Sequence, residues 1–242
     1  MNPIEYIGPR PQKPTRKSWV GGWLMVILVV VSVSFVAKPF VIKALAQNEG
    51  VTALKVEETV AWLSQSDAFG DQLAIAALER TQNKVVYDTE YYQLSYPNGD
   101  IPSDRGLSSD VLVRSYRSLG IDLQQLVHED MKGNFRIYPQ LWNLNKPDTN
   151  IDHRRVPNLQ RFFARHGEEV KLSSDRSSTD FNYGDVVVWR LHDNKPHIGI
   201  VVPGPGERRS EKWIVHNIGG GPQWENALFD YQIRALYRYN GQ

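Results

Sequence analysis

Four polar side chains, far apart in the sequence, are of the types that combine in nucleophilic catalysis. Ser108 stands where the loop "SDRGL" turns into apolar residues at helical spacing, and its hydroxyl becomes a nucleophile when a base removes its proton. His197 begins the apolar run "HIGIVV", while His216 and Asn217 end the run "KWIVHN". A nucleophile, a histidine base and a polar group that orients the base are the parts of an acyl-transfer site.

A hairpin is expected to bring the histidines together. The turn-rich stretch "PGPGERRSE" separates the two apolar runs, and the small neighbour Gly199 leaves room above the sheet beside His197. In one register His197 falls opposite Asn217, and a slip of one step places His216 there instead. Asn217 and His216 therefore both stand as candidates for the orienting residue.

The start of a helix suits the nucleophile. The free N–H groups and the dipole of a helix N-terminus stabilise a developing anion, and Ser108 lies at such a place. The run Ser108, Ser109 and Asp110 is also well suited to capping the helix through its side-chain oxygens. The two roles are compatible, because a capping position can also be an active-site position.

Other charged residues admit two interpretations. Arg154 and Arg155, in the run "DHRRV", are candidates for binding a substrate, because a guanidinium matches the geometry of a carboxylate. Asp110 is a third candidate for contact with the substrate. The alternative is an Asp–Arg network that braces the loop.

We expect no metal site and no cofactor. The cluster His192, Asp193, His197 and His216 matches no compact metal-ligand spacing. The "GGG" run at residues 219–221 follows a strand but opens no helix and lacks the lysine of a phosphate-binding loop. With a formal net charge of +1, the chain has no broad positive surface for nucleic acid. It contains no cysteine, which excludes disulfides and a cysteine nucleophile in the chain as written.

The spacing of apolar residues predicts helices first and strands later. Helical periodicity marks "DAFGDQLAIAALERTQNK", with Asp67 as its N-cap, and then the stretch from Ser108, "IDLQQLVHEDM" and "LQRFFARHG", the last ended by Gly167. Alternation then predicts four strands, "GDVVVWRL", "HIGIVV", "KWIVHNI" and "ALYRY". Helices followed by an antiparallel sheet predict an α+β domain.

An uncharged apolar segment at residues 18–37 is long enough to cross a membrane as one helix. Basic residues predominate before it, so we expect the N-terminus in the cytoplasm and the rest of the chain outside. The expected organisation is a tail at 1–17, an anchor at 18–37, a stalk at 38–65 and a folded domain at 66–242. A cleaved signal peptide, with "ALA" at residues 44–46 as the cleavage site, is the alternative.

Several runs resemble known bacterial families. The pair "HIGIVVPGPG" and "KWIVHNIGGG" is similar to two strands of papain-like cysteine peptidases, and "YGDVVVWRL" resembles a strand of the NlpC-type cell-wall amidopeptidases in the same clan. More closely, the chain from about Tyr96 to Tyr239 resembles the bacterial family called domain of unknown function 1287. The runs that carry this resemblance are "GDIPSDRGLSSDVLVRSYRSLGIDLQQLVHEDM", "YPQLW", "NIDHRRVPNLQRFF", "HIGIVV" and "VHNIGGG".

The resemblance implies a papain-like fold and assigns roles to individual residues. It places Ser108 in the nucleophile slot, where the family has cysteine, with His197 as base and Asn217 as orienter. It also implies that Tyr96 lines the site. Either serine replaces a natural cysteine at position 108, or Ser108 is native and the domain works slowly or not at all, since a hydroxyl is far harder to deprotonate than a thiol.

The expected function follows from the clan and the location. It is a papain-like amidase or peptidase, anchored in the bacterial inner membrane by one helix, with its C-terminal domain in the periplasm, and its expected substrate is a peptidoglycan peptide or a protein. The alternative is a non-catalytic binding or scaffold protein of the cell envelope, which would use the papain-like groove to hold a cell-wall peptide or an envelope protein partner.

Overall fold

The structure is a computed structural model that describes residues 23, 25–31, 52–173 and 178–242. The chain divides into two compact units, Met1–Val51 and Thr52–Gln242. In the first unit, residues 23 and 25–31 are helical. The predicted tail at 1–17 and most of the predicted anchor at 18–37 lie outside the described residues. Within the described ranges, no helix is both long and apolar enough to cross a membrane.

A six-stranded antiparallel sheet forms the centre of the second unit, with the strand order β3-β8-β4-β5-β6-β7. The four strands that alternation predicted are all present, as β4 (Val186–Arg190), β5 (Pro196–Pro203), β6 (Lys212–His216) and β8 (Gln232–Arg238). Two short edge strands, β3 (Glu168–Glu169) and β7 (Gln223–Glu225), were not predicted. A separate parallel pair joins β1 (Val86–Tyr87) to β2 (Arg105–Gly106).

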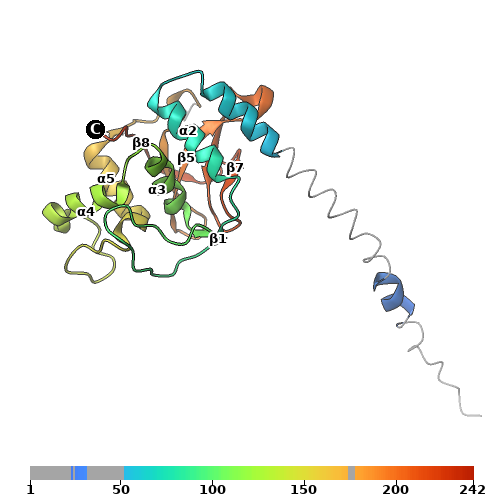
Figure 1. Cartoon of the computed structure of the whole chain (residues 1–242), viewed down its shortest axis with the longest axis horizontal. Coiled ribbons are helices and arrows are strands. Elements are labelled where there is room, and N and C mark those ends of the chain that lie inside the picture. The colour runs from blue at the N-terminus through green and yellow to red at the C-terminus, as the bar shows by residue number, and fades with distance from the viewer. Residues whose placement is uncertain (1–22, 24, 32–51, 174–177) are drawn as a thin grey trace, which may run out of the picture. The chain divides into compact units, whose positions relative to one another are not determined.

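Helices precede the sheet in the chain and cover one of its faces (Figure 1). The labelled helices are α2 (Phe69–Arg80), α3 (Ser108–Ser118), α4 (Leu123–Asn134) and α5 (Val156–His166). Short 3-10 turns occur at η1 (Phe135–Ile137), η2 (Asp152–Arg154), η3 (Ser178–Asp180) and η4 (Gly206–Arg208). Because α2, α3 and α5 all pack on β5, this strand is the axis of the helix–sheet core.

Alternation along β5 divides the core into two clusters. Ile198, Ile200 and Val202 join the large cluster beneath the helices, whereas Val201 belongs to a smaller cluster on the opposite face with Trp189. Both clusters are completely or almost completely removed from solvent. The buried apolar area that drives folding is therefore distributed over both faces of the sheet.

The predicted α+β class is confirmed, but two boundaries differ from the prediction. The folded unit begins at Thr52 rather than at residue 66, because Val56 and Leu63, on a helix over residues 52–63, are buried in the main core. Asp67 does not cap α2, whose N-cap residue is Ala68. Gly167 ends α5 as expected.

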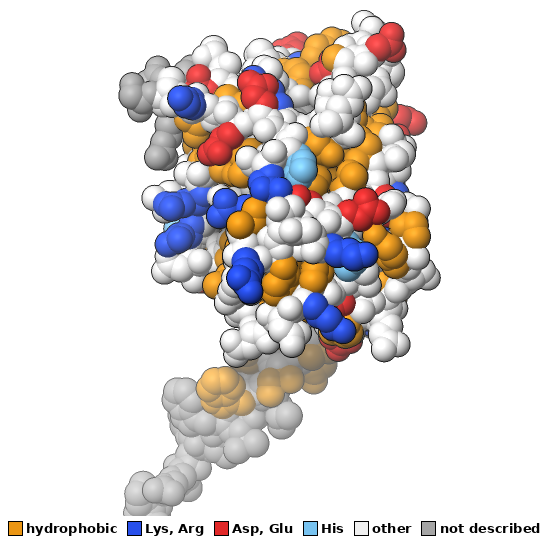
Figure 2. Space-filling view, turned by 90° about the vertical axis from the view of Figure 1, so that its left-hand side faces the viewer, with side chains coloured by type: hydrophobic (Ala, Val, Ile, Leu, Met, Phe, Trp, Pro, Cys, Tyr) orange, Lys and Arg blue, Asp and Glu red, His pale blue; other side chains and the backbone are white. Residues whose placement is uncertain are grey.

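The surface carries mixed charge. Figure 2 shows one face on which Lys and Arg side chains are interspersed with Asp, Glu and apolar side chains. This mixture agrees with the formal net charge of +1.

Helix α2 meets the sheet through two glycines whose backbones touch. A Cβ atom on Gly70 would lie 2.3 Å from the carbonyl oxygen of Tyr183, and one on Gly184 would lie 2.3 Å from the oxygen of Gly70. Gly133 offers a matched control, because it lies inside α4 and a Cβ there would meet nothing within 4 Å.

We therefore predict opposite effects for two Gly→Ala changes. Gly70→Ala should lower the free energy of unfolding by roughly 1–3 kcal/mol, because backbone must move to admit the methyl group. Gly133→Ala should raise it by about 0.5–1 kcal/mol, because alanine is the better helix former. Urea unfolding of the two variants measures both, and a Gly70→Ala variant as stable as Gly133→Ala would contradict the close packing of α2.

Candidate active site

Ser108 and His197 line a common cavity of about 520 Å³. Ser108 is the first residue of α3, and His197 is the second residue of β5, so the cavity lies where the helix begins above the start of the strand. Both side chains are buried, with exposed fractions of 6% and 4%. No hydrogen bond joins them in this structure. The two residues that the sequence proposed as nucleophile and base thus face one cavity without direct contact.

His197 is the end of a chain of hydrogen bonds. Its Nε2 lies 2.9 Å from Nδ1 of His216, and Nε2 of His216 lies 3.0 Å from Oε2 of Glu225. A carboxylate only accepts hydrogen bonds, so His216 donates to it from Nε2 and, as a neutral ring, accepts at Nδ1. His197 must then donate from Nε2, which leaves a lone pair on its Nδ1.

The strand register explains why His216 rather than Asn217 contacts His197. Ile200 pairs with Val215, so the next step along the two strands places Gly199 across from His216. His197 lies two residues before Gly199 and on the same face of the strand, so both histidines share one face of the sheet. Space for this contact exists because position 199 is glycine. A Cβ there would lie 3.0 Å from Cζ3 of Trp189 and 3.1 Å from Cβ of His216.

The ring of Trp189 packs against both imidazoles. Its ring centroid lies 5.9 Å from that of His197 and 6.2 Å from that of His216, and its indole N–H donates to the carbonyl of Leu228. The indole therefore restricts the tilt of both rings.

Asn217 has a different role from the predicted one. Its Nδ2 donates to the carbonyl oxygen of Gly106 at 3.0 Å, and its Oδ1 accepts from the backbone N–H of Gly219 at 3.1 Å. The expectation that Asn217 orients His197 is therefore wrong in this structure. Asn217 instead connects the end of β6 to the residues that lead into α3.

The first turn of α3 is not capped by a serine. The N-cap residue is Leu107, and its N–H donates to Oδ2 of Asp110 at 2.6 Å. Ser109 donates its hydroxyl to the carbonyl of Arg154 at 2.7 Å. The hydroxyl of Ser108 has no hydrogen-bond partner among the described residues, so it remains available to the cavity.

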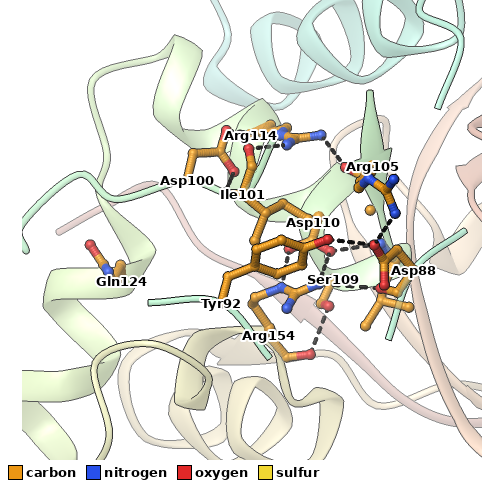
Figure 3. Close-up of polar contacts among 12 residues, drawn as sticks. Asp88, Tyr92, Asp100, Ile101, Arg105, Ser109, Asp110, Arg114, Gln124 and Arg154 are labelled. Carbon is orange, nitrogen blue, oxygen red and sulfur yellow. Dashed lines mark hydrogen bonds and ion pairs between the residues drawn. The ribbon is translucent and has the colours of Figure 1, made fainter. Parts of the chain in front are cut away.

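Arg154 and Asp110 form a buried ion pair (Figure 3). Arg154 donates from Nε and Nη2 to the two carboxylate oxygens of Asp110, at 2.8 and 3.0 Å, and from Nη1 to the carbonyl of Glu90 at 3.0 Å. The two side chains are only 1% and 4% exposed. The structure thus supports the bracing role of Arg154 and Asp110, and it also places Arg154 in the wall of the cavity that Ser108 and His197 line.

The remaining candidates for substrate binding, Arg155 and Tyr96, do not line this cavity. Arg155 pairs with Asp152 at 3.3 Å, and its guanidinium stacks 4.0 Å above the ring of Trp142. Tyr96 packs its ring against His128, with the centroids 5.1 Å apart, and does not line the cavity. The expectation that Tyr96 lines the site is therefore wrong for this structure.

Burial disfavours the protonated form of both imidazoles. It lowers the pKa of His197 to about 3, with a smaller contribution from His216, and it also lowers the pKa of His216, against the opposing effect of the Glu225 carboxylate. Among the described residues, no group of three or more potential ligands is arranged to hold a metal ion. The site can therefore offer a neutral base, an unpartnered hydroxyl and the N–H groups at the start of α3.

Comparison with known proteins gives one family and one close relative. The family described as "Domain of unknown function (DUF1287)" matches residues 74–239. The Escherichia coli (strain K12) protein called "Uncharacterized protein YijF" is 48% identical over 169 residues, which cover 69% of this chain and 81% of that protein. No solved structure matches the chain.

The buried ion pair yields a prediction about stability. Arg154→Met leaves the Asp110 carboxylate buried without its partner, so we expect the free energy of unfolding to fall by roughly 3 kcal/mol or more. Lys195→Met serves as the control, because its partner Asp193 is half exposed and remains solvated without the ammonium group. Equal urea midpoints for the two variants would contradict the bracing role of Arg154.

The low pKa of His197 yields a prediction about acid stability. Its folded pKa of about 3 lies below the ordinary value near 6.5, so the unfolded chain binds more protons between these values and stability falls as the pH decreases through this window. Between pH 7 and pH 4.5 the wild type should lose roughly 2 kcal/mol more than His197→Gln. The exposed His192 provides the control, and His192→Gln should follow the wild-type pH profile. Parallel profiles for wild type and His197→Gln would contradict the burial argument.

Proposed function

This chain belongs to the DUF1287 family, and we propose that its cavity is the active site of a papain-like amide hydrolase. The observation that carries the proposal is the hydrogen-bond chain from Glu225 through His216 to His197, which ends in the cavity that Ser108 also lines. In this assignment the residue at position 108 is the nucleophile and His197 is the base. His216 and Glu225 are positioning residues, because they act through the ring of His197.

The proposed reaction is acyl transfer through a covalent intermediate. The oxygen at position 108 attacks the amide carbonyl while its proton moves to Nδ1 of His197. The N–H groups at the start of α3 stabilise the oxyanion. His197 then gives the proton to the leaving amine, and water hydrolyses the acyl-enzyme with His197 again as base.

The serine at position 108 limits this chemistry. A base with a pKa of about 3 is poorly matched to a hydroxyl, whose proton must leave during the attack. A thiol in the same place loses its proton far more readily, and the resulting thiolate would in turn favour protonated His197. The arrangement is therefore better suited to a cysteine than to the serine that this chain carries.

The substrate and location follow from the resemblance to cell-wall amidopeptidases and from the apolar segment at residues 18–37. We propose that the segment anchors the protein in the inner membrane with the folded unit in the periplasm, and that the amide bonds lie in peptidoglycan peptides.

A non-catalytic binding protein is the second candidate. It is favoured by the separation of Ser108 from His197, which share a cavity but no hydrogen bond in this structure, and by the weak base. Such a protein would hold a cell-wall peptide in the cavity without cleaving it.

Activity measurements on purified muropeptides separate the two candidates. We predict slow or no turnover by the Ser108 protein and at least about a hundredfold faster turnover by Ser108→Cys, because the thiolate is the better nucleophile. The double variant Ser108→Cys with His197→Ala should lose this gain. Binding of muropeptides without turnover by all three proteins would exclude the hydrolase and favour the binding protein.

Glu225 provides a separate test of the hydrogen-bond chain. In the Ser108→Cys background, Glu225→Gln should reduce kcat with little change in KM, and should change the pH profile of kcat, because an amide no longer fixes the proton on Nε2 of His216. Glu207, an exposed residue of η4 between β5 and β6, supplies the control, and Glu207→Gln should leave kcat unchanged. An unchanged pH profile in Glu225→Gln would contradict its positioning role.

A further inference from the structure

A second cavity, of about 300 Å³, is lined by the end of α2, by α3 and by the loop before β2. Leu107 lines both this cavity and the candidate active site. Three arginines contribute to its wall, Arg80, Arg114 and Arg117. The reaction proposed above uses none of them.

Positive charge exceeds negative charge at this second cavity. Its wall includes two carboxylates, but that of Asp110 is already neutralised by Arg154. Asp100 alone faces the arginines, and its Oδ2 lies 2.9 Å from Nε of Arg114 and 3.0 Å from Nη1 of Arg117. Arg80 has no carboxylate partner among the described residues. The three guanidinium groups thus face one free carboxylate, which pairs with two of them.

Backbone carbonyls hold two of the guanidinium groups in place. Arg114, whose side chain is 10% exposed, donates to the carbonyl oxygens of Arg105, Ile101 and Pro102. Arg117 donates from Nη2 to the carbonyl of Gly99 at 2.9 Å. These bonds fix the groups before any ligand arrives, which lowers the entropy cost of binding one.

Donors in this wall remain unsatisfied. The Nε atoms of Arg80 and Arg117 are buried and have no hydrogen-bond partner among the residues that the structure describes, and Nη1 of Arg117 has only the ion pair with Asp100. A buried donor without a partner is costly, and an anionic oxygen in the cavity would remove that cost. The unsatisfied donors therefore point to a missing acceptor.

We propose that this cavity binds an oxyanion, a carboxylate or phosphate group, through Arg80 and Arg117. A guanidinium presents paired N–H donors that match either group. The sequence suggested Arg154 and Arg155 for binding a carboxylate, but these two arginines form ion pairs with Asp110 and Asp152. Binding here does not require a reaction at Ser108, so it can be tested whether or not the protein is a hydrolase.

Arg80 is the residue to change, because no hydrogen bond or ion pair within the described residues would be lost with it. Isothermal titration calorimetry of the full chain with inorganic phosphate and, separately, with succinate should show saturable binding of at least one of them. Ionic strength is held constant with NaCl, because surface charges also attract anions weakly. The preference between the two probes identifies the source of the oxyanion.

Three variants test whether the binding of the oxyanion depends on Arg80. Arg80→Ala should weaken binding by about tenfold or more, since a charge-assisted hydrogen bond is lost. Arg136→Ala, at an exposed arginine outside this cavity, and Ser108→Ala should both bind like the wild type. Absence of saturable binding with either probe, or equal binding by Arg80→Ala and Arg136→Ala, would overturn the proposal.

Discussion

The buried ion pair between Asp110 and Arg154 is the interaction on which the geometry of the site depends. Neither charge could remain in the interior without the other, because an unpaired buried charge costs several kcal/mol. Asp110 lies in the first turn of α3 and Arg154 ends η2, so the pair fixes where the helix begins relative to that turn. The same carboxylate accepts from the N–H of Leu107, and the carbonyl of Arg154 accepts from Ser109. Ser108 lies between these two anchored residues and is held at the cavity wall by them.

A second constraint starts from the opposite side of the cavity. An acceptor-only carboxylate at Glu225 determines the direction of each hydrogen bond that follows it, through His216 to His197. The absence of a side chain at Gly199 lets the two rings approach, and Trp189 limits their tilt. Asn217 links the two constraints, because it follows β6 directly after His216 and bonds to Gly106 just before α3. The helix start and the histidine chain are thus parts of one connected arrangement.

Alternation and helical periodicity were sufficient to predict the four main strands and the α+β class, since long apolar patterns reflect burial directly. They were insufficient for Glu225, which belongs to the three-residue strand "QWE" with no alternation to mark it. His216 and Asn217 could not be separated, because a single step of register exchanges their faces. The role of Arg154 was also undecided, because the sequence does not show whether a guanidinium already has a partner. Arg80 and Arg117 have no sequence signal, since their common feature is a shortage of nearby acceptors, which only the fold determines.

The tautomer of His197 is the most direct test of this account. Long-range proton–nitrogen NMR correlation spectra of the folded protein at pH 7, with His197 assigned through His197→Gln, report which ring nitrogen carries the proton. We predict a neutral ring with the proton on Nε2 and an unprotonated Nδ1, in both the wild type and His192→Gln. A proton on Nδ1 of His197 would contradict this assignment, because the lone pair would then point to His216 and His197 would offer no base to the cavity.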